Sequence, residues 1–358
     1  MNIPFKDAIE VLQSNTDLPP WIIENSLGSI FSAQWNESQI ASFLVALNLK
    51  GLTGEILATV ARFLRKNSNF VVTTQGPEKV HQTLIRPFGD SCGTGGDGLH
   101  TFNISTLAAI IAAAGGLRIA KHGNRSITSL CGSADLLFFL GYPETLSSHE
   151  ALQLFDETGL TFLFAPQVHP LMKSIGNVRK SLGIPTVFNY VGPLSNPLQP
   201  DFQIIGVNRS TLLLPMAEAL RSLNSIQGLI IHSRDGLDEI SPSAITDAVK
   251  IDQKSLTQAE IDPAAFGLKG QLHDLKGGDA ATNSRILWKI LDNDPEVQVL
   301  TKTVCLNAGS LFWTANIVSS LHDGFEKALE IVTSHKAHRY LKSWIQTAQK
   351  NHQGGSTP

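Results

Sequence analysis

Charged side chains are scarce in this sequence. Lysine, arginine, aspartate and glutamate make up 16% of its 358 residues, well below the roughly 25% of an average soluble protein. The 28 basic and 31 acidic residues leave a net charge of -3, which excludes the broad basic surface of a generic nucleic-acid-binding or membrane-surface protein. Because 42% of the residues are apolar and a domain takes about 150 residues, we expect two domains and a large buried core.

Cysteine is also rare, and long apolar runs are absent. Cys92, Cys131 and Cys305 are odd in number and far apart, so neither a disulfide framework nor a zinc site is expected. The longest uncharged apolar run, residues 107–117, is much shorter than the roughly 20 residues that span a bilayer. Residues 1–11 carry acidic side chains where a signal peptide is apolar. These absences predict a cytoplasmic protein that does not span a membrane.

Residues 1–75 show only helical patterns. Asn36 and Gln39 have the capping-box spacing, and apolar residues then recur every three or four positions. Thr53 precedes a second stripe of this kind, which ends in basic side chains where the helix dipole favours positive charge. These patterns predict a small all-helical N-terminal domain.

A different pattern follows from residue 76, in which short apolar runs end in polar or glycine-rich turns and lead into longer helical segments. The clearest strand candidates are residues 117–120, 160–164, 202–207 and 228–232. This alternation predicts an α/β domain with a mostly parallel central sheet flanked by helices. Ligands of such sheets bind beyond the carboxyl ends of the strands.

The change of pattern also predicts the domain boundaries. The helical domain covers residues 1–75, and the α/β domain covers residues 76–174 and 198–345. Between the two α/β segments, residues 175–197 are helical at first and then rich in Gly, Pro and Asn, which predicts a hinge that contributes to the helical layer. Residues 346–358 form a polar tail, expected to be disordered from residue 351.

Residues 93–98 read Gly-Thr-Gly-Gly-Asp-Gly, which formally matches the dinucleotide pattern GxGxxG. The match alone is weak, because a plain glycine turn also satisfies it. A dinucleotide site needs an acidic residue about 20 positions further on for the ribose, and residues 98–134 contain none. No Walker lysine or kinase catalytic loop is present either. The dinucleotide and kinase interpretations are therefore excluded.

Groups that bind anions accompany this loop instead. Asn103, Ser105 and Thr106 stand at the start of an apolar helix, and Lys121 and Arg125 stand at the end of a predicted strand. Amides in a glycine nest and at a helix N-terminus attract anions, and the two cations add full charges. One such polar residue alone would be read as a helix cap. The whole set predicts a ligand with several phosphates.

Two carboxylates, Asp238 and Glu239, follow the predicted strand 228–232. Acidic pairs in loops are usually solvated surface, but a parallel sheet places this loop at the same edge as the anion-binding loop. The carboxylates would repel a polyphosphate unless a divalent cation lay between, and Mg²⁺ binds through one or two carboxylates plus substrate phosphates. We therefore predict magnesium here, with the Ser105 hydroxyl as a further ligand.

Short motifs run through nearly the whole chain: GTGGDG (93–98), TFNIST (101–106), AKHGNR (120–125), GSADLL (132–137), FLFAP (162–166), HPLMK (169–173), NVRKSLG (177–183), FNYVGPLSNP (188–197), GLDEIS (236–241), GGDA (277–280) and NAG (307–309). In this order they resemble the anthranilate phosphoribosyltransferase family, whose fold is shared with pyrimidine nucleoside phosphorylases. Several motifs in family order are far more specific than the glycine loop alone.

The resemblance implies an enzyme of tryptophan biosynthesis, which transfers phosphoribose from phosphoribosyl pyrophosphate to the amino group of anthranilate and releases pyrophosphate. It assigns the phosphoribosyl pyrophosphate to Gly93, Gly96, Asp97, Thr101, Asn103, Ile104, Ser105, Thr106, Lys121, Ser129 and Ser133. It assigns anthranilate to Gly93, His122, Asn124, Arg179 and Pro193, and two magnesium ions to Ser105, Asp238 and Glu239. No residue is assigned as a catalytic base, because an aromatic amine is already neutral near pH 7. The resemblance also implies a homodimer joined through the helical domain, with no nucleic-acid or membrane partner.

Three positions depart from the family pattern. Pro185 stands where arginine is usual, Leu130 where lysine is frequent, and His100 where a smaller residue is found in the glycine loop. The loss of cations leaves open a divergent paralogue that uses another aromatic amine. A nucleoside phosphorylase is a further alternative, against which the KHGN and NVR segments count. So is a non-catalytic relative that binds nucleic acid, against which the retained carboxylates and the acidic net charge count.

Overall fold

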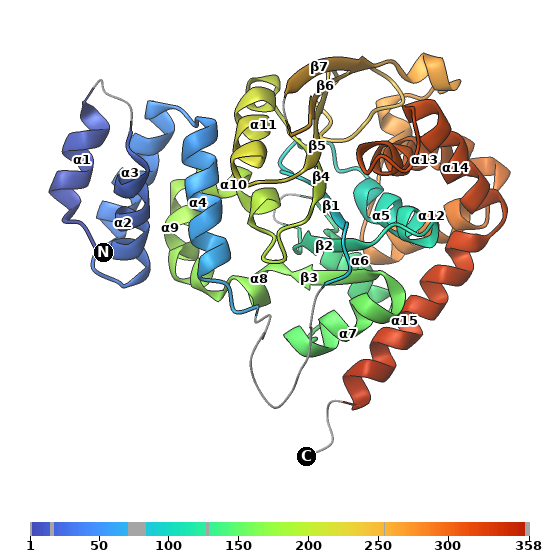
Figure 1. Cartoon of the computed structure of the whole chain (residues 1–358), viewed down its shortest axis with the longest axis horizontal. Helices are drawn as coiled ribbons and strands as arrows, with labels where there is room; N and C mark the ends of the chain where they lie inside the picture. The colour runs from blue at the N-terminus through green and yellow to red at the C-terminus, as the bar shows by residue number, and fades with distance from the viewer. Residues whose placement is uncertain (1, 15–17, 71–83, 127–128, 254, 355–358) are drawn as a thin grey trace.

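Four helices at the N-terminus form a bundle on one side of the molecule (Figure 1). The computed structural model describes residues 2–14, 18–70, 84–126, 129–253 and 255–354. The bundle helices are α1 (Phe5–Gln13), α2 (Pro20–Phe31), α3 (Glu37–Lys50) and α4 (Gly54–Lys66). The Gln39 amide donates to Asn36 Oδ1 and the Asn36 amide donates to Gln39 Oε1, both at 3.0 Å, which confirms the predicted capping box. Thr53 caps α4 through the Ile56 amide.

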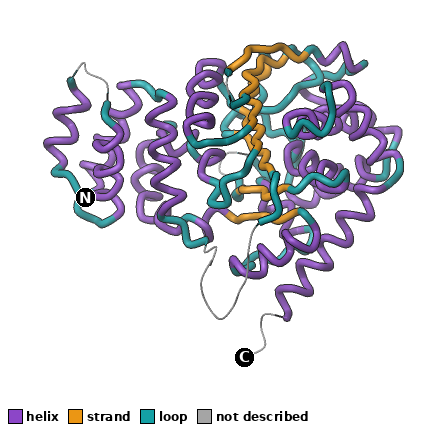
Figure 2. Tube along the Cα trace, viewed as in Figure 1, coloured by secondary structure: helices purple, strands orange, loops and turns teal. Residues whose placement is uncertain are grey.

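A sheet of seven strands, counted within the described ranges, forms the centre of the larger part (Figure 2). The strands are β1 (Gly89–Gly93), β2 (Ile119–Gly123), β3 (Leu160–Phe164), β4 (Phe202–Gly206), β5 (Gln227–Ser233), β6 (Thr246–Ile251) and β7 (Leu256–Ile261). Their spatial order is β3-β2-β1-β4-β5-β6-β7. The pairs from β3 to β5 are parallel, and the pairs β5–β6 and β6–β7 are antiparallel. The predicted α/β class with a mostly parallel sheet is confirmed.

Three strands, β1, β6 and β7, were not among the clearest strand candidates. The sequence of β1 is Gly-Asp-Ser-Cys-Gly, which has almost no apolar side chain, yet β1 lies between β2 and β4. Its strand conformation therefore depends on pairing with residues distant in sequence, which a local pattern does not reveal. The hairpin β6–β7 is an antiparallel edge with exposed polar side chains on β7, so it lacks the apolar run that identifies a buried parallel strand.

Helices cover both faces of the sheet. Those of the α/β part are α5 (Ile104–Ala114), α6 (Ser133–Phe139), α7 (Ser148–Thr158), α11 (Leu213–Ser222), α12 (Ala280–Leu291), α13 (Gln298–Thr314), α14 (Leu321–Thr333) and α15 (Lys336–Gly354), with short 3₁₀ turns at Ser210–Leu212, Pro263–Phe266, Leu272–Leu275 and Pro295–Val297. Successive strand residues face opposite sides: Ile204 and Ile231 pack in the core with α5 and α13, whereas Ile205 and Ile230 pack in the core shared by α11 and the bundle. Of the helices described, none is both long and apolar enough to cross a membrane.

The segment after β3 returns to the bundle before the chain enters β4. It contains α8 (Ala165–Val168), the 3₁₀ segment η1 (Pro170–Ile175), α9 (Gly176–Leu182), α10 (Val187–Tyr190) and the 3₁₀ segment η2 (Gly192–Ser195). Val178, Phe188 and Leu194 share one hydrophobic core with the bundle helices. This crossing segment, residues 165–196, therefore connects the sheet to the helical layer.

The C-terminal helix α15 runs past residue 346, where the polar tail is predicted to begin, and the expected disorder from residue 351 is wrong for residues 351–354. The helix continues to Gly354, and the Asn351 side chain is buried. Leu341, Trp344 and Ala348 recur at helical spacing and are almost fully buried, and Trp344 Nε1 donates to a β3 carbonyl oxygen at 2.8 Å. The polar composition concealed this narrow apolar stripe. The predicted tail beyond it, residues 355–358, lies outside the described residues.

The three cysteines are free thiols. Burial is the largest influence on all three and raises their pKa values, that of Cys131 to about 11. Such thiols stay protonated at neutral pH and are poor nucleophiles.

Candidate active site

The carboxyl ends of β1 and β4 mark the switch point of the sheet. The chain continues from β1 to β2 on one side and later adds β4 on the other side of β1, and ligands bind in the crevice at such a point. Gly93 and Gly206 lie opposite each other at these ends. A Cβ atom on Gly93 would lie 2.1 Å from Asp238 Oδ2, and one on Gly206 would lie 1.6 Å from the Asp238 carbonyl oxygen. The loop after β5 therefore reaches this crevice only because both residues are glycine.

The glycine loop that follows β1 has a left-handed backbone, with φ of 67° at Gly95 and 75° at Gly96 and Gly98, a conformation that favours glycine. The Gly95 amide donates to Asp238 Oδ2 at 2.7 Å. The Gly95 carbonyl accepts from Asn208 Nδ2, just beyond β4, at 2.8 Å. The loop is thus held against the ends of two other segments, and successive amides in such a conformation form an anion-binding nest. Asn208 was not predicted from the sequence.

Asp238 and Glu239 lie beside this loop, and the environment of both carboxyl groups raises their pKa. Burial is the main cause; the charge of Asp97 adds to the rise at Asp238, and the charge of Asp238 adds to the rise at Glu239. Lys121 and Ser105 favour the charged form of Glu239 and so oppose its rise. The donor set consists of hard oxygens with excess negative charge, which fits magnesium. No three His, Cys, Asp or Glu side chains of the described part are grouped to hold a metal alone, so such ions would need further ligands from substrate and water.

The acidic loop is held in shape by Asp235, whose role was not predicted. Ser241 and Ser243 each donate a hydroxyl hydrogen bond of 2.6 Å to Asp235 Oδ2. At the other side of the loop, Asn307 on α13 binds both the amide and the carbonyl of Ile240 at 3.0 Å. The Asp-Gly pair at 235–236, a turn former, and the NAG motif were the available sequence signals.

Lys121 brings a cation to the crevice, whereas Arg125 does not. Lys121, on β2, is almost fully buried; its Nζ donates to the Ser91 carbonyl and lies 3.3 Å from Ser105 Oγ. The Arg125 guanidinium is half exposed and binds Asp135 at 3.2 Å and Glu144 at 2.9 Å. The expectation that Arg125 adds free positive charge to the anion site is therefore wrong, because acidic side chains after β2 already pair with it.

The start of α5 is joined to two other helices by side-chain hydrogen bonds. Asn103 precedes α5 but does not cap it with its side chain. Instead Asn103 Nδ2 donates to the Cys131 carbonyl at 3.1 Å, and Asn103 Oδ1 accepts from Asn283 on α12 at 2.9 Å. Thr106 Oγ1 donates to Ser133 Oγ, at the start of α6, at 3.1 Å. The structure thus brings together three of the predicted phosphoribosyl pyrophosphate side chains: Asn103, Thr106 and Ser133.

The remaining predicted residues on this side make contacts with the backbone, the core or a neighbouring side chain. Thr101 forms an isolated bridge with the segment before α12, and Ile104 is buried in the core. The Ser129 hydroxyl lies 2.6 Å from a neighbouring serine hydroxyl. The Asn124 carbonyl accepts from the second residue of α6 at 3.2 Å. These contacts fix the backbone and do not by themselves identify a ligand.

A buried histidine pair lies on the side of β2 that faces the crossing segment. The rings of His122 and His169 are edge to face with their centroids 5.2 Å apart. His169 Nε2 donates to the Ser195 carbonyl at 3.0 Å, next to Pro193. Burial, with His169 beside it, lowers the pKa of His122 to about 3, and burial lowers that of His169 to about 4. Both imidazoles are neutral at pH 7, and His122 Nε2 has no hydrogen-bond partner among the described residues.

Arg179 lies on α9. Its Nη2 is 3.5 Å from Asn189 Oδ1, and its guanidinium carbon is 5.9 Å from the centroid of the Phe188 ring. Arg179 Nε is buried and finds no partner within the described ranges, and burial lowers its pKa. Arg179 thus contacts other residues of the crossing segment to which it belongs.

The three departures from the family pattern lie at the surface. Pro185 is exposed and its carbonyl accepts from Asn48 Nδ2 of α3 at 2.6 Å. Leu130 is 69% exposed. His100 is exposed with a left-handed φ of 52°, and its carbonyl accepts from the Gly277 amide at 2.9 Å. Among the described residues, none of the contacts of these three residues involves a side chain that binds the acidic loop.

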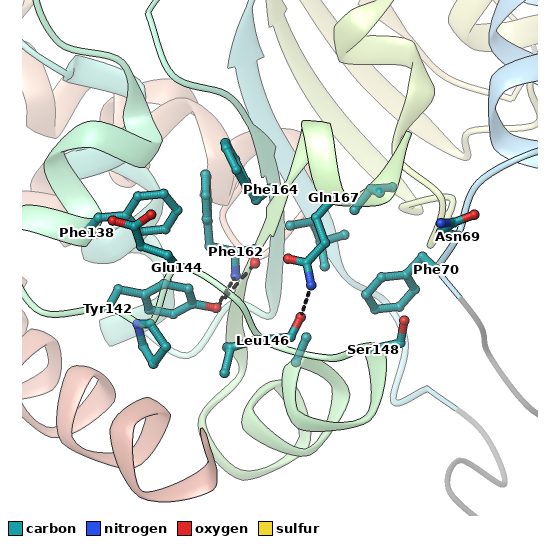
Figure 3. Close-up of a pocket in the computed structure, with 14 residues that line it drawn as sticks. Asn69, Phe70, Phe138, Tyr142, Glu144, Leu146, Ser148, Phe162, Phe164 and Gln167 are labelled. Carbon is teal, nitrogen blue, oxygen red and sulfur yellow. Dashed lines mark hydrogen bonds between the residues drawn. The ribbon is translucent and has the colours of Figure 1, made fainter. Parts of the chain in front are cut away.

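A pocket of about 220 Å³ lies at the outer edge of the sheet, beside β3 and α7 (Figure 3). Its walls include the aromatic side chains of Phe138, Tyr142, Phe162 and Phe164, together with aliphatic and polar residues. None of the residues predicted for substrate or magnesium is among those that line it. The polar groups that suit a phosphorylated ligand are at the switch point instead, two strands away.

Comparison with known proteins identifies relatives of the whole chain. The helical bundle domain of a glycosyl transferase family matches residues 6–68, and the a/b domain of that family matches residues 86–338. The anthranilate phosphoribosyltransferase of Hydrogenovibrio crunogenus is 37% identical over 96% of this chain and 98% of its own length. That of Streptococcus mutans is also 37% identical, over 96% and 99%.

Solved structures agree with this relationship. The anthranilate phosphoribosyltransferase of Thermus thermophilus has a TM-score of 0.85 at 33% identity and covers 96% of this chain and 99% of its own. The Saccharomyces cerevisiae enzyme in complex with phosphoribosyl pyrophosphate and magnesium has a TM-score of 0.85 at 28% identity, with 97% and 98% covered. The same yeast enzyme in complex with 4-fluoroanthranilate has a TM-score of 0.84.

Proposed function

Because this chain belongs to the anthranilate phosphoribosyltransferase family, we propose that its switch-point crevice transfers phosphoribose from phosphoribosyl pyrophosphate to the amino group of anthranilate. The bond from C1 of the ribose to pyrophosphate breaks, and its electron pair leaves with pyrophosphate. A bond forms between C1 and the amine nitrogen, which loses one proton to solvent. The products are pyrophosphate and N-(5-phosphoribosyl)anthranilate, an intermediate of tryptophan biosynthesis. The observation that carries the proposal is the acidic pair of buried Asp238 and partly buried Glu239, with Asp238 bound to the anion-binding glycine loop.

The leaving pyrophosphate lies along the glycine loop and the start of α5, near Gly96, Asn103 and Lys121. Lys121 and the loop amides stabilise the negative charge that develops as the bond breaks, which is the most effective form of catalysis for such a step. Ser105, Asp238 and Glu239 would hold magnesium, which we propose binds as two ions and would neutralise the same charge. The raised pKa values of the acidic pair support this, since a cation between carboxylates and phosphates relieves their repulsion.

The acceptor lies on the opposite side of C1, between the end of β2 and the crossing segment. His122, Asn124 and Pro193 line its ring, and Arg179 pairs with its carboxylate through a planar guanidinium. The neutral state of His122 supports this arrangement, because a cation there would repel the partial positive charge on the amine during attack. Orientation is the main contribution of this wall, because the aniline nitrogen needs no prior deprotonation.

A homodimer joined through the helical domain, residues 1–75, is part of this proposal. Trp21 on α2 and Leu49 on α3 are large apolar side chains that are 54% and 84% exposed, as expected for a surface that a second copy covers. Light scattering on the wild type and on a Leu49→Asp variant tests it: the dimer mass should fall to that of a monomer in the variant.

The decisive experiment mixes the purified protein with magnesium, phosphoribosyl pyrophosphate and anthranilate and follows the loss of anthranilate fluorescence. We expect a loss that requires all three components and is accompanied by release of one pyrophosphate per anthranilate. A Glu144→Gln variant, altered at the surface beside Arg125, is the matched control and should react at the wild-type rate. Consumption of phosphoribosyl pyrophosphate with another aromatic amine but not with anthranilate would indicate the divergent paralogue instead.

A further inference from the structure

Asp90, on β1, is a fully buried carboxylate that binds three parts of the molecule. Its Oδ1 accepts from its neighbour, the Ser91 amide, at 2.7 Å and from the His122 amide on β2 at 3.2 Å. Its Oδ2 accepts from Asn196 Nδ2 at 2.9 Å. The Asp90 side chain is 0% exposed, so these bonds do not compete with water.

Asn196 extends this contact to the crossing segment. Its Nδ2 also donates to the Ala120 carbonyl on β2 at 2.8 Å, and its Oδ1 accepts from the Leu198 amide at 3.0 Å. Asn196 is itself 0% exposed and directly follows η2, which contains Pro193. The Asp90–Asn196 bond is therefore the point at which the strand that leads into the glycine loop holds the proposed acceptor wall.

The same wall is bound from other places as well: Gln203 on β4 donates through Nε2 to the Pro193 carbonyl at 3.0 Å. Arg65, near the end of α4, donates through Nε to the Leu194 carbonyl at 2.8 Å, and His169 donates to the Ser195 carbonyl. Each of these bonds ends on a backbone carbonyl of η2, and none of them reaches β1. Of the hydrogen bonds described for this wall, the bond from Asn196 to Asp90 is the one that connects it to the strand before the glycine loop.

Burying an ionisable side chain at the position of Asp90 costs free energy. Burial raises the pKa of Asp90 to about 6, although Lys121 and the three hydrogen bonds oppose the rise. A carboxylate that is buried at this cost in free energy suggests that the position needs something a neutral side chain lacks. An amide has only one acceptor atom, whereas Asp90 uses both oxygens to accept from donors on different elements.

We propose that Asp90 is a positioning residue for the transfer: acting through Asn196 and the His122 amide, it fixes the distance between the acceptor wall and the glycine loop. This inference rests on the proposed function, because it assumes that the two walls hold the two reactants. Reaction between two bound molecules is sensitive to displacements of about 1 Å. Asp90 does not touch either substrate in this arrangement.

The variant that tests this is Asp90→Asn. Its amide oxygen can keep the bonds to the Ser91 and His122 amides, but its NH₂ group then faces the NH₂ group of Asn196, and the contact between them is lost. Asn196→Ala removes the same bond from the other side and serves if Asp90→Asn does not fold. The matched control is Asp201→Asn. Asp201 is also buried and accepts from the Phe88 amide at 3.0 Å, but it lies at the amino ends of the same strands, β1 and β4.

We expect kcat/KM for anthranilate to fall about tenfold or more in Asp90→Asn and Asn196→Ala, while the Kd for phosphoribosyl pyrophosphate with magnesium stays within about twofold. Hydrogen exchange of peptides that cover residues 187–198 should be faster in both variants and unchanged in Asp201→Asn. Kinetic constants in Asp90→Asn equal to those of Asp201→Asn would overturn the proposal, and so would an equal loss of affinity for both substrates. A wild type that consumes no anthranilate would instead refute the proposed function, which the fluorescence assay reports before any variant is made.

Discussion

Replacing Lys121 with methionine removes the cation at the centre of the candidate site while nearly preserving its volume. Lys121 is 2% exposed and lies between two acidic groups: its charge opposes the rise in pKa of Asp90 on one side and of Glu239 on the other. Removing one partner of a buried charge pair typically costs about 3 to 5 kcal/mol. We expect a loss of this size in the free energy of unfolding near pH 8.

The same change should weaken the binding of phosphoribosyl pyrophosphate. A charge-assisted hydrogen bond contributes about 1.5 to 3 kcal/mol, which corresponds to about a 10- to 150-fold rise in KM for phosphoribosyl pyrophosphate. The KM for anthranilate should change by less than about threefold. Initial rates at varied concentrations of each substrate, with urea unfolding in parallel, measure both effects.

The loss of stability should also depend on pH. Without Lys121, the folded-state pKa of Asp90 rises further above about 6. A carboxyl group whose folded pKa is raised supports the fold while it is protonated, and that support is lost as the pH rises through the folded pKa. The variant should therefore be closer to the wild type in stability at pH 5 than at pH 8.

Arg125→Met is the control, because Arg125 follows the same strand but is already paired with Asp135 and Glu144 at the surface. Its KM for phosphoribosyl pyrophosphate should remain within about twofold of the wild type. A Lys121→Met protein with wild-type KM for phosphoribosyl pyrophosphate, or an Arg125→Met protein with the larger defect, would refute the placement of the anion site.

Three further predictions concern the other charged groups. Asp238→Asn combined with Glu239→Gln should abolish turnover, yet raise the thermal midpoint of the metal-free protein at pH 8 by removing adjacent like charges; a near-normal rate at ordinary magnesium would place the ions elsewhere. Arg179→Met should lose about 2 kcal/mol of acceptor binding, about thirtyfold in KM for anthranilate, with little effect on phosphoribosyl pyrophosphate; aniline, which has no carboxylate, should react equally poorly with wild type and variant, and strong discrimination between the two proteins would contradict the pairing. Because the pKa of buried Asp90 is raised from 3.8 to about 6, the stability of the wild type relative to Asp90→Asn should fall by about 2.4 kcal/mol between pH 4 and pH 7; a difference that does not vary with pH in chemical denaturation would show that Asp90 is not buried as a titrating group.

The parts of the fold that depend on local chemistry could be predicted from the sequence. The capping box at Asn36 and Gln39 involves residues three apart, and the structure forms it as expected. Strand β3 matches its predicted range, because a short apolar run bounded by turns has the length of a buried strand and is too short for a helix. Strand β1 has no such run. It forms a strand because it pairs with β2 and β4, so no local sequence pattern predicts it.

In the candidate site too, some features could be predicted from local residue types and others could not. The glycine loop and the acidic pair carry distinctive residue types, and the structure brings them together. The pairing of Asp90 with Asn196 joins residues 106 positions apart, and each of them alone resembles an ordinary polar residue. The expectation that Arg125 adds free positive charge to the anion site is wrong because its partners are not apparent from the local sequence. Asp135 and Glu144 approach Arg125 only when α6 and the turn after it fold back.

The two glycines at the switch point have a consequence for how mutations in this enzyme should be understood. At Gly206, a side chain as small as a methyl group would occupy the position of the Asp238 backbone, and at Gly93 it would occupy that of the Asp238 carboxylate. A change to alanine at Gly206 would therefore push the acidic loop out of the crevice without altering any group proposed to bind substrate or metal. In a survey of inactive variants such a change would be grouped with losses of chemistry, although its origin is purely steric. The functional core of this protein thus includes two positions defined by the absence of a side chain.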